Sequence, residues 1–153
     1  MMTFQAQCWL PAEPDAVFDY CRSTAGFREH FPYAVRWHSK GGLWLEGDTL
    51  DFRYRYMGVW LPHKTRITEL QPARSFTDVM ERGLYRHFRH RHDFAPEQGG
   101  TRLTDTVEFS FGAGALVDRL LGIPTLRRAF AQRHQALQRR FGRESEHAGQ
   151  SLS

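Results

Sequence analysis

The sequence predicts an α+β fold in which one long C-terminal helix covers an antiparallel sheet of about seven strands. Two observations predict this fold. Nearly the whole stretch 36–111 reads as extended segments separated by short turns, and the stretch 123–141 carries apolar residues at helical spacing. The chain has 153 residues, 41% of them apolar and 14% aromatic, which suits one domain with a single core. We assign that domain to residues 1–143 and expect 144–153 to form a small, polar, disordered tail.

The first part of the chain predicts one strand followed by two short helices. Residues 3–10 alternate between apolar and polar side chains, and Pro11 ends this strand. Acidic residues around Pro14 then mark the start of a helix, and apolar residues follow at helical spacing as far as Cys21. A second short helix at 24–30 stops before Pro32, because a residue that precedes proline is pushed out of the helical region.

The middle of the chain predicts the other strands of the sheet. Residues 48–57 alternate most clearly, which indicates a strand with one buried and one exposed face. Glycine, proline and aspartate between the apolar segments supply the turns. The predicted strands are 35–38, 48–57, 63–70, 75–81, 84–94 and 101–111.

Residues 123–141 predict the helix that covers the sheet. A short helical segment at 115–121 precedes it, and Gly122 forms a hinge between the two. Pro124 fits the first turn, where its missing N–H costs nothing, and Gly142 is expected to end the helix. The apolar face of this helix carries Ile123, Leu126, Phe130, His134, Leu137 and Phe141.

Charge and composition narrow the classes of partner. The net charge is +4, and the basic residues, all but two of them arginine, are scattered rather than collected in one block. No zinc-finger, basic-zipper or ribonucleoprotein motif is present, so we expect no nucleic-acid partner. The basic surface would allow transient contact with anionic lipid surfaces. We expect a monomer or a homodimer.

The sequence predicts a cytoplasmic protein. Cys8 and Cys21 match no metal or redox spacing and are expected to be reduced thiols in the core. The N-terminus shows no secretory leader, and no apolar run approaches the roughly 18 residues that a membrane span requires. We therefore expect no integral association with a membrane.

Polar side chains lie on the apolar face of the last two predicted strands. One face of 84–94 carries Phe88, His90, His92 and Phe94, and one face of 101–111 carries Leu103, Asp105, Val107, Phe109 and Phe111. If Phe94 lies opposite Leu103, then His92 lies opposite Asp105. A slip by one residue would bury arginines and is excluded, whereas slips by two residues remain open.

This arrangement has two interpretations. A buried carboxylate without a partner is strongly penalised, so Asp105 needs a partner, with His92 the nearest candidate and His134 the next. The pair can simply fix the register of the core. Alternatively, these three residues and His90 line a cavity and present polar groups to an apolar ligand. We expect no metal and no cofactor, because the ligand spacings of zinc sites are absent.

Four stretches in this order make the chain resemble a known superfamily. They are RITE at 66–69 with Pro72 and Phe76, HRHDF at 90–94, GGTRLTD at 99–105, and 126–130 with Arg133, Leu137 and Phe141. With these stretches the chain resembles the SRPBCC superfamily, the START-like and birch-pollen-allergen-like helix-grip domains, and specifically its bacterial polyketide cyclase/dehydrase-like members. The resemblance implies a curved seven-stranded sheet wrapped around the terminal helix, with a deep cavity for lipids, sterols or polyketides.

We therefore expect carriage or sensing of a small hydrophobic or amphipathic molecule, such as a lipid or polyketide, in a cavity between sheet and helix. The alternatives are a cyclase or dehydratase in which His92 with Asp105 removes a proton and His90 assists, and an interaction module with a solid core. Asp78 and Arg86 are less well defined candidates for the lining. The expected ligand-binding residues are Phe52, Tyr54, Tyr56, Phe88, His90, His92, Asp105, Val107, Phe109, Phe130 and His134.

Overall fold

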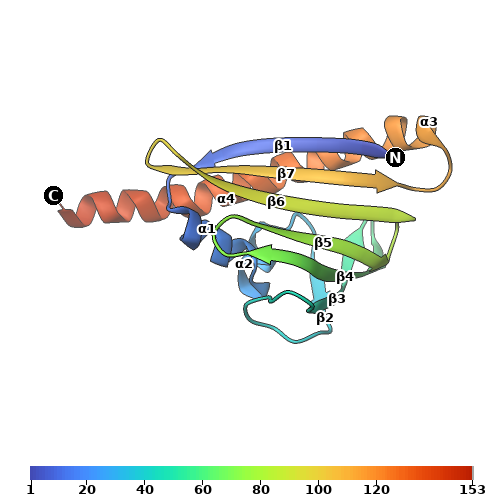
Figure 1. Ribbon diagram of the computed structural model, residues 1–153, viewed down its shortest axis with the longest axis horizontal. Coiled ribbons are helices and arrows are strands. Elements are labelled where there is room, and N and C mark those ends of the chain that lie inside the picture. Colours follow the sequence, from blue (N-terminus) through green and yellow to red (C-terminus); the bar gives the residue numbers. More distant parts are fainter. Residues whose placement is uncertain (153) are drawn as a thin grey trace.

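A computed structural model of the protein describes the backbone of residues 1–152 and the side chains of residues 1–144 (Figure 1). It contains seven strands, two short helices after the first strand, and a long terminal helix that follows a short helical lead-in. The elements are β1 (Met2–Leu10), α1 (Pro14–Cys21), α2 (Thr24–His30), β2 (Val35–Trp37), β3 (Thr49–Tyr56), β4 (Val59–Gln71), β5 (Ser75–Arg82), β6 (His87–Glu97), β7 (Gly100–Ser110), α3 (Ala115–Val117), η1 (Asp118–Gly122) and α4 (Ile123–Leu152).

The strands form one antiparallel sheet in the order β1-β7-β6-β5-β4-β3-β2. In Figure 1, α4 runs behind the sheet along β1 and β7, and α1 and α2 lie near the middle of α4. Helix α4 contacts β1 and α2, and α1 contacts β6 and β7. The predicted α+β helix-grip fold is therefore confirmed, including the two short helices and the seven strands.

Several predicted boundaries were wrong. Strand β4 begins at Val59 rather than 63 and contains Pro62. This proline is tolerated because β5 pairs with β4 only from Lys64 onward, so β4 has a single neighbour at Pro62. Helix α4 continues past Gly142 to Leu152, and the segment before it is a turn of π-helix. The predicted disordered tail, 144–153, falls almost wholly on residues whose side chains lie outside the described part of the chain.

The core consists of two apolar clusters at different heights along α4. Leu126 and Phe130 pack with the cluster that contains Val107 and Phe109 of β7. About two turns further along the helix, Leu137 and Phe141 pack with a second cluster. That second cluster includes Phe18 of α1, Phe76 of β5 and Phe94 of β6. The stretch of α4 between the two clusters carries Arg133 and His134, which are both buried.

Gly122 allows the start of α4 to approach β7 closely. A Cβ atom at this position would lie 2.2 Å from Cε2 of Phe109, a fully buried ring. We expect Gly122→Ala to lower the free energy of unfolding by about 1–3 kcal/mol, because the extra methyl group overpacks the core. Urea unfolding measures this change.

Gly142 supplies the matched control for that substitution. It lies inside α4, and a Cβ atom there would meet nothing within 4 Å. Gly142→Ala should raise the free energy of unfolding by about 0.5–1 kcal/mol, because alanine loses less backbone entropy in a helix. Equal effects of the two substitutions would contradict the close approach of Gly122 to Phe109.

Candidate functional site

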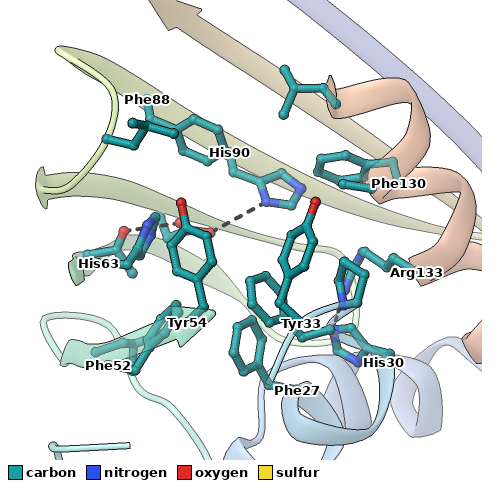
Figure 2. Close-up of a pocket in the computed structure, with 18 of the residues that line it drawn as sticks. Phe27, His30, Tyr33, Phe52, Tyr54, His63, Phe88, His90, Phe130 and Arg133 are labelled. Carbon is teal, nitrogen blue, oxygen red and sulfur yellow. Dashed lines mark hydrogen bonds and ion pairs between the residues drawn. The ribbon is translucent and has the colours of Figure 1, made fainter. Parts of the chain in front are cut away.

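A cavity of about 160 Å³ lies between the inner face of β3–β6, α2 with the loop after it, and the first half of α4. Figure 2 shows aromatic rings of Phe27, Tyr33 and Tyr54 on one side of this cavity, opposite His90 and Phe130. Leu84, which is 46% exposed, lies at its edge. Aromatic and aliphatic side chains make up most of the wall, and a few polar groups interrupt it. The polar side chains include His30, His63, Thr65, Asp78, His90, His92 and Arg133.

The structure places the predicted site residues in two groups. Seven line the cavity: Phe52, Tyr54, Tyr56, Phe88, His90, His92 and Phe130. Four are buried behind its wall: Asp105, Val107, Phe109 and His134. Those on β7 share the inward face of the sheet, but α4 packs directly over Val107 and Phe109 and leaves them no access to the cavity. Of the two less defined candidates, Asp78 lines the cavity and Arg86 does not.

Asp105 is fully buried at the centre of a polar cluster. Its Oδ1 lies 2.9 Å from Nε2 of His90 and 3.1 Å from Nδ1 of His92. Its Oδ2 lies 2.6 Å from Nε2 of His134 and 3.2 Å from Nε of Arg133, both on α4. The predicted register, with His92 opposite Asp105, is confirmed. Both expected partners of Asp105, His92 and His134, are therefore present, together with His90 and Arg133.

The cluster is held together by charge. Burial alone would raise the pKa of Asp105, but the Arg133 guanidinium and hydrogen bonds from the histidines hold it well below its ordinary value. Burial lowers the pKa of His90 to about 4, so this imidazole is neutral at pH 7. Burial would also lower the pKa of Arg133, but Asp105 raises it above its ordinary value. Asp105 and Arg133 thus form a buried ion pair between sheet and helix.

A second buried carboxylate, Asp78 on β5, faces the cavity. Its Oδ1 accepts a hydrogen bond from Oγ1 of Thr65 at 3.0 Å. Its Oδ2 lies 3.1 Å from Nε2 of His92 and 3.9 Å from Nδ1 of His90. Burial would raise the pKa of Asp78, but the hydrogen bond from His92 and the electrostatic effect of the neighbouring imidazoles lower it overall. The two histidines of β6 therefore lie between two carboxylates.

Sequence reasoning missed Arg133 as a member of this site. Its guanidinium contacts Asp105 and also Nε2 of His30 on α2. A signal for its position was present, because Arg133 follows Phe130 by three residues and precedes Leu137 by four, within the apolar stripe of α4. His63 and Thr65 were also missed, although they alternate with Ile67 on the inward face of β4.

Comparisons with known proteins agree on family and fold. The family described as polyketide cyclase/dehydrase and lipid transport matches residues 1–142. No curated protein matches the sequence. Within the described part of the chain, no helix is long and apolar enough to span a bilayer.

Solved structures with the same fold share little sequence with this chain. A protein from Thermus thermophilus aligns at 16% identity and a TM-score of 0.73, covering 94% of this chain and 99% of its own. The major latex-like protein 151 of Panax ginseng aligns at 9% identity and a TM-score of 0.71, covering 92% and 97%. Ara h 8.0201 aligns at 14% identity and 0.68, covering 90% and 95%. At these identities the likeness extends to the fold alone.

Proposed function

Because the chain belongs to the polyketide cyclase/dehydrase and lipid transport family, we propose that it carries or senses a small hydrophobic or amphipathic molecule, such as a lipid or polyketide, held between the sheet and α4. The observation that carries this proposal is the cavity itself, a largely aromatic space with polar groups at one wall. Such a lining is typical of pockets that bury an apolar ligand and orient it through a few polar contacts.

The size and chemistry of the cavity restrict what it would hold. A volume of about 160 Å³ is close to that of a dry protein cavity that accepts benzene, which suits one ring or a short acyl segment. The remainder of a larger ligand would lie at the edge, beside Leu84 and Tyr85. An oxygen atom of the ligand would lie towards His90 and Asp78, where the wall is polar. The ligand expected here is therefore apolar with one oxygen-bearing end.

The geometry supports binding better than the cyclase or dehydratase alternative. Catalysis by His92 with Asp105 needs a ring nitrogen of His92 that is free to take a proton from the substrate. Both nitrogens of His92 already have polar partners, Nε2 at Asp78 and Nδ1 at Asp105. Asp105 has no exposed surface and does not reach the cavity. We therefore propose a binding function for residues 1–143 and not an acid–base reaction.

Filling the cavity tests this function. Ala129 lines the cavity from α4, so Ala129→Phe would place a ring in the space that the ligand needs. We expect the substitution to weaken binding of the apolar fluorophore 1-anilinonaphthalene-8-sulfonate at least tenfold, a loss of about 1.4 kcal/mol. Titration of the fluorophore into protein that has been treated with a chelator, followed by its fluorescence, measures the dissociation constant.

Ala131→Phe is the matched control, because Ala131 lies two residues further along α4 and is exposed. It should leave the affinity unchanged. Thermal unfolding of both variants checks that each is folded. Equal affinities in Ala129→Phe and the unsubstituted protein would refute binding in this cavity, as would equal losses in the two variants.

We place this function in the cytoplasm. Cys8 and Cys21 are both buried and free. Proteins of oxidising compartments commonly pair their cysteines, whereas reducing compartments keep them as thiols. Fractionation of cells that express the tagged chain, followed by immunoblotting, tests this assignment, and recovery in a secreted fraction would refute it.

A further inference from the structure

Three potential metal ligands converge on the wall of the cavity. Asp78 on β5 pairs directly with His90 on β6, and His92 follows on the same face of β6. One ligand atom from each side chain lies within 4.8 Å of the other two. All three side chains line the cavity. The strand pairing itself therefore brings two imidazoles and a carboxylate together at a position that a ligand in the cavity would reach.

The distances between these atoms are near those of a coordination shell. Nitrogen and oxygen ligands lie about 2.0–2.2 Å from a zinc ion, which places neighbouring ligand atoms roughly 3.0–3.5 Å apart. Nε2 of His92 lies 3.1 Å from Oδ2 of Asp78, already in this range. Nδ1 of His90 lies 3.9 Å from the same oxygen. A modest rotation of the His90 side chain would bring its Nδ1 into the same range. The three ligand atoms would then surround one ion.

The remaining polar atoms of the three residues already have partners. Thr65 donates to Oδ1 of Asp78 and leaves Oδ2 facing the two imidazoles. Asp105 accepts from Nε2 of His90, and Nδ1 of His92 lies 3.1 Å from Asp105 and 3.2 Å from Nη2 of Arg133. Nδ1 of His90 and Nε2 of His92 therefore face Asp78. A carboxylate that fixes the far nitrogen of a histidine in this way is typical of metal sites. Oδ1 of Asp105 lies beside the far nitrogen of both histidines.

The charges of the cluster favour an added cation. Asp105 and Arg133, which contact each other, are buried, and the Asp78 side chain is only 13% exposed. These three groups alone sum to one negative charge, and Asp78 is the carboxylate that faces the cavity. Nε2 of His92 lies 3.1 Å from Oδ2 of Asp78. A metal ion in place of the proton between these two atoms would set a positive charge beside the carboxylate, since buried charges are paired or coordinate metals.

We propose that Asp78, His90 and His92 bind a divalent transition-metal ion, of the zinc or ferrous class, at the wall of the cavity. Two histidines and one carboxylate suit these ions, and three protein ligands leave coordination positions open. Those positions face the cavity and would accept an oxygen donor of the bound molecule. This proposal departs from the expectation drawn from the sequence, where the spacing gave no metal signal.

Metal titration in the absence of any apolar ligand tests the site independently of the function proposed above. After treatment with a chelator and dialysis, the full chain is titrated with ZnCl₂ by calorimetry and with CoCl₂ by visible absorption. We expect one ion per chain. Asp78→Asn removes a ligand and should weaken binding more than a hundredfold. Thr65→Val keeps all three ligands but removes the hydrogen bond that orients Asp78, and should weaken binding about tenfold.

Asp93→Asn is the matched control, because the Asp93 side chain in the middle of β6 is 40% exposed and its partner is Arg91. The Asp93→Asn variant should bind the ion as tightly as the unsubstituted protein. Circular dichroism confirms that each variant is folded, and Thr65→Val keeps the test informative if Asp78→Asn does not fold. The absence of stoichiometric binding would overturn the proposal, and so would equal affinities for Asp78→Asn and Asp93→Asn. Neither result bears on fluorophore binding by metal-free protein.

Discussion

Asp105→Asn is expected to lower the free energy of unfolding by about 3–5 kcal/mol, a large share of the roughly 5–15 kcal/mol typical of a domain. The substitution keeps the shape of the side chain and removes its charge. Arg133 then remains buried between sheet and helix without a carboxylate partner, because Asp105 is the acidic group it contacts. Urea unfolding at pH 7 measures the loss.

Two further variants show whether the buried charge causes that loss. Asp93→Asn is the same chemical change at a position where the side chain is 40% exposed, so we expect a change within about 0.5 kcal/mol. Replacing both partners, with Asp105→Asn and Arg133→Met together, should restore most of the stability, since no unpaired charge is left. A loss below about 1 kcal/mol in Asp105→Asn alone would contradict the buried ion pair.

Acidification from pH 6.5 to 5 is expected to lower the stability of the metal-free protein by about 2–4 kcal/mol. Burial lowers the pKa of His30 well below the ordinary value of 6.5, and Arg133 adds to the effect. Burial also lowers the pKa of His63, and it lowers that of His90 to about 4. Below pH 6.5 the unfolded chain takes up protons at these histidines before the folded chain does. A histidine that stays neutral in the folded chain contributes at most about 1.4 kcal/mol per pH unit, so stability is present above pH 6.5 and is lost as the pH falls.

Substitution of one histidine isolates its contribution to this pH dependence. His30→Gln should reduce the slope of the free energy of unfolding between pH 6.5 and 5 by about 1.4 kcal/mol per pH unit, because one titrating group is removed. His38→Gln changes an exposed histidine and should leave the slope unchanged. A slope that His30→Gln leaves unaltered would show that His30 takes up a proton in the folded state.

The sheet could be predicted in detail because its signals are local or nearly so. The alternation in 48–57 and the parity of 84–94 against 101–111 determine which residues face inward. Among the registers that this parity left open, the structure has the one with His92 opposite Asp105. The boundaries were less predictable. Pro62 and Gly142 normally end regular structure, but here a missing neighbour strand and a continuing helix override those preferences.

The site was only partly predictable, because periodicity shows which residues face inward and not what covers them. Val107 and Phe109 face the interior as predicted, but α4 packs on them instead of leaving a cavity. Tyr33 lies in the loop after α2, where no period exists to assign a face, yet it lines the cavity. Arg133 was not assigned to the site because periodicity gives no buried partner for a charged residue within the apolar stripe, and Asp105 is that partner.

The position of the buried ion pair between two apolar clusters has a consequence for how α4 is seated. Apolar packing is not directional, so a helix held by apolar contacts alone could shift along the sheet. The hydrophobic effect would favour a shift that covers the apolar wall of the cavity. A shift by one turn, about 5.4 Å, would instead drag Arg133 away from Asp105 and into phenylalanine side chains. The ion pair therefore fixes the position of α4 along the sheet. In this position the helix leaves the cavity open instead of packing into it.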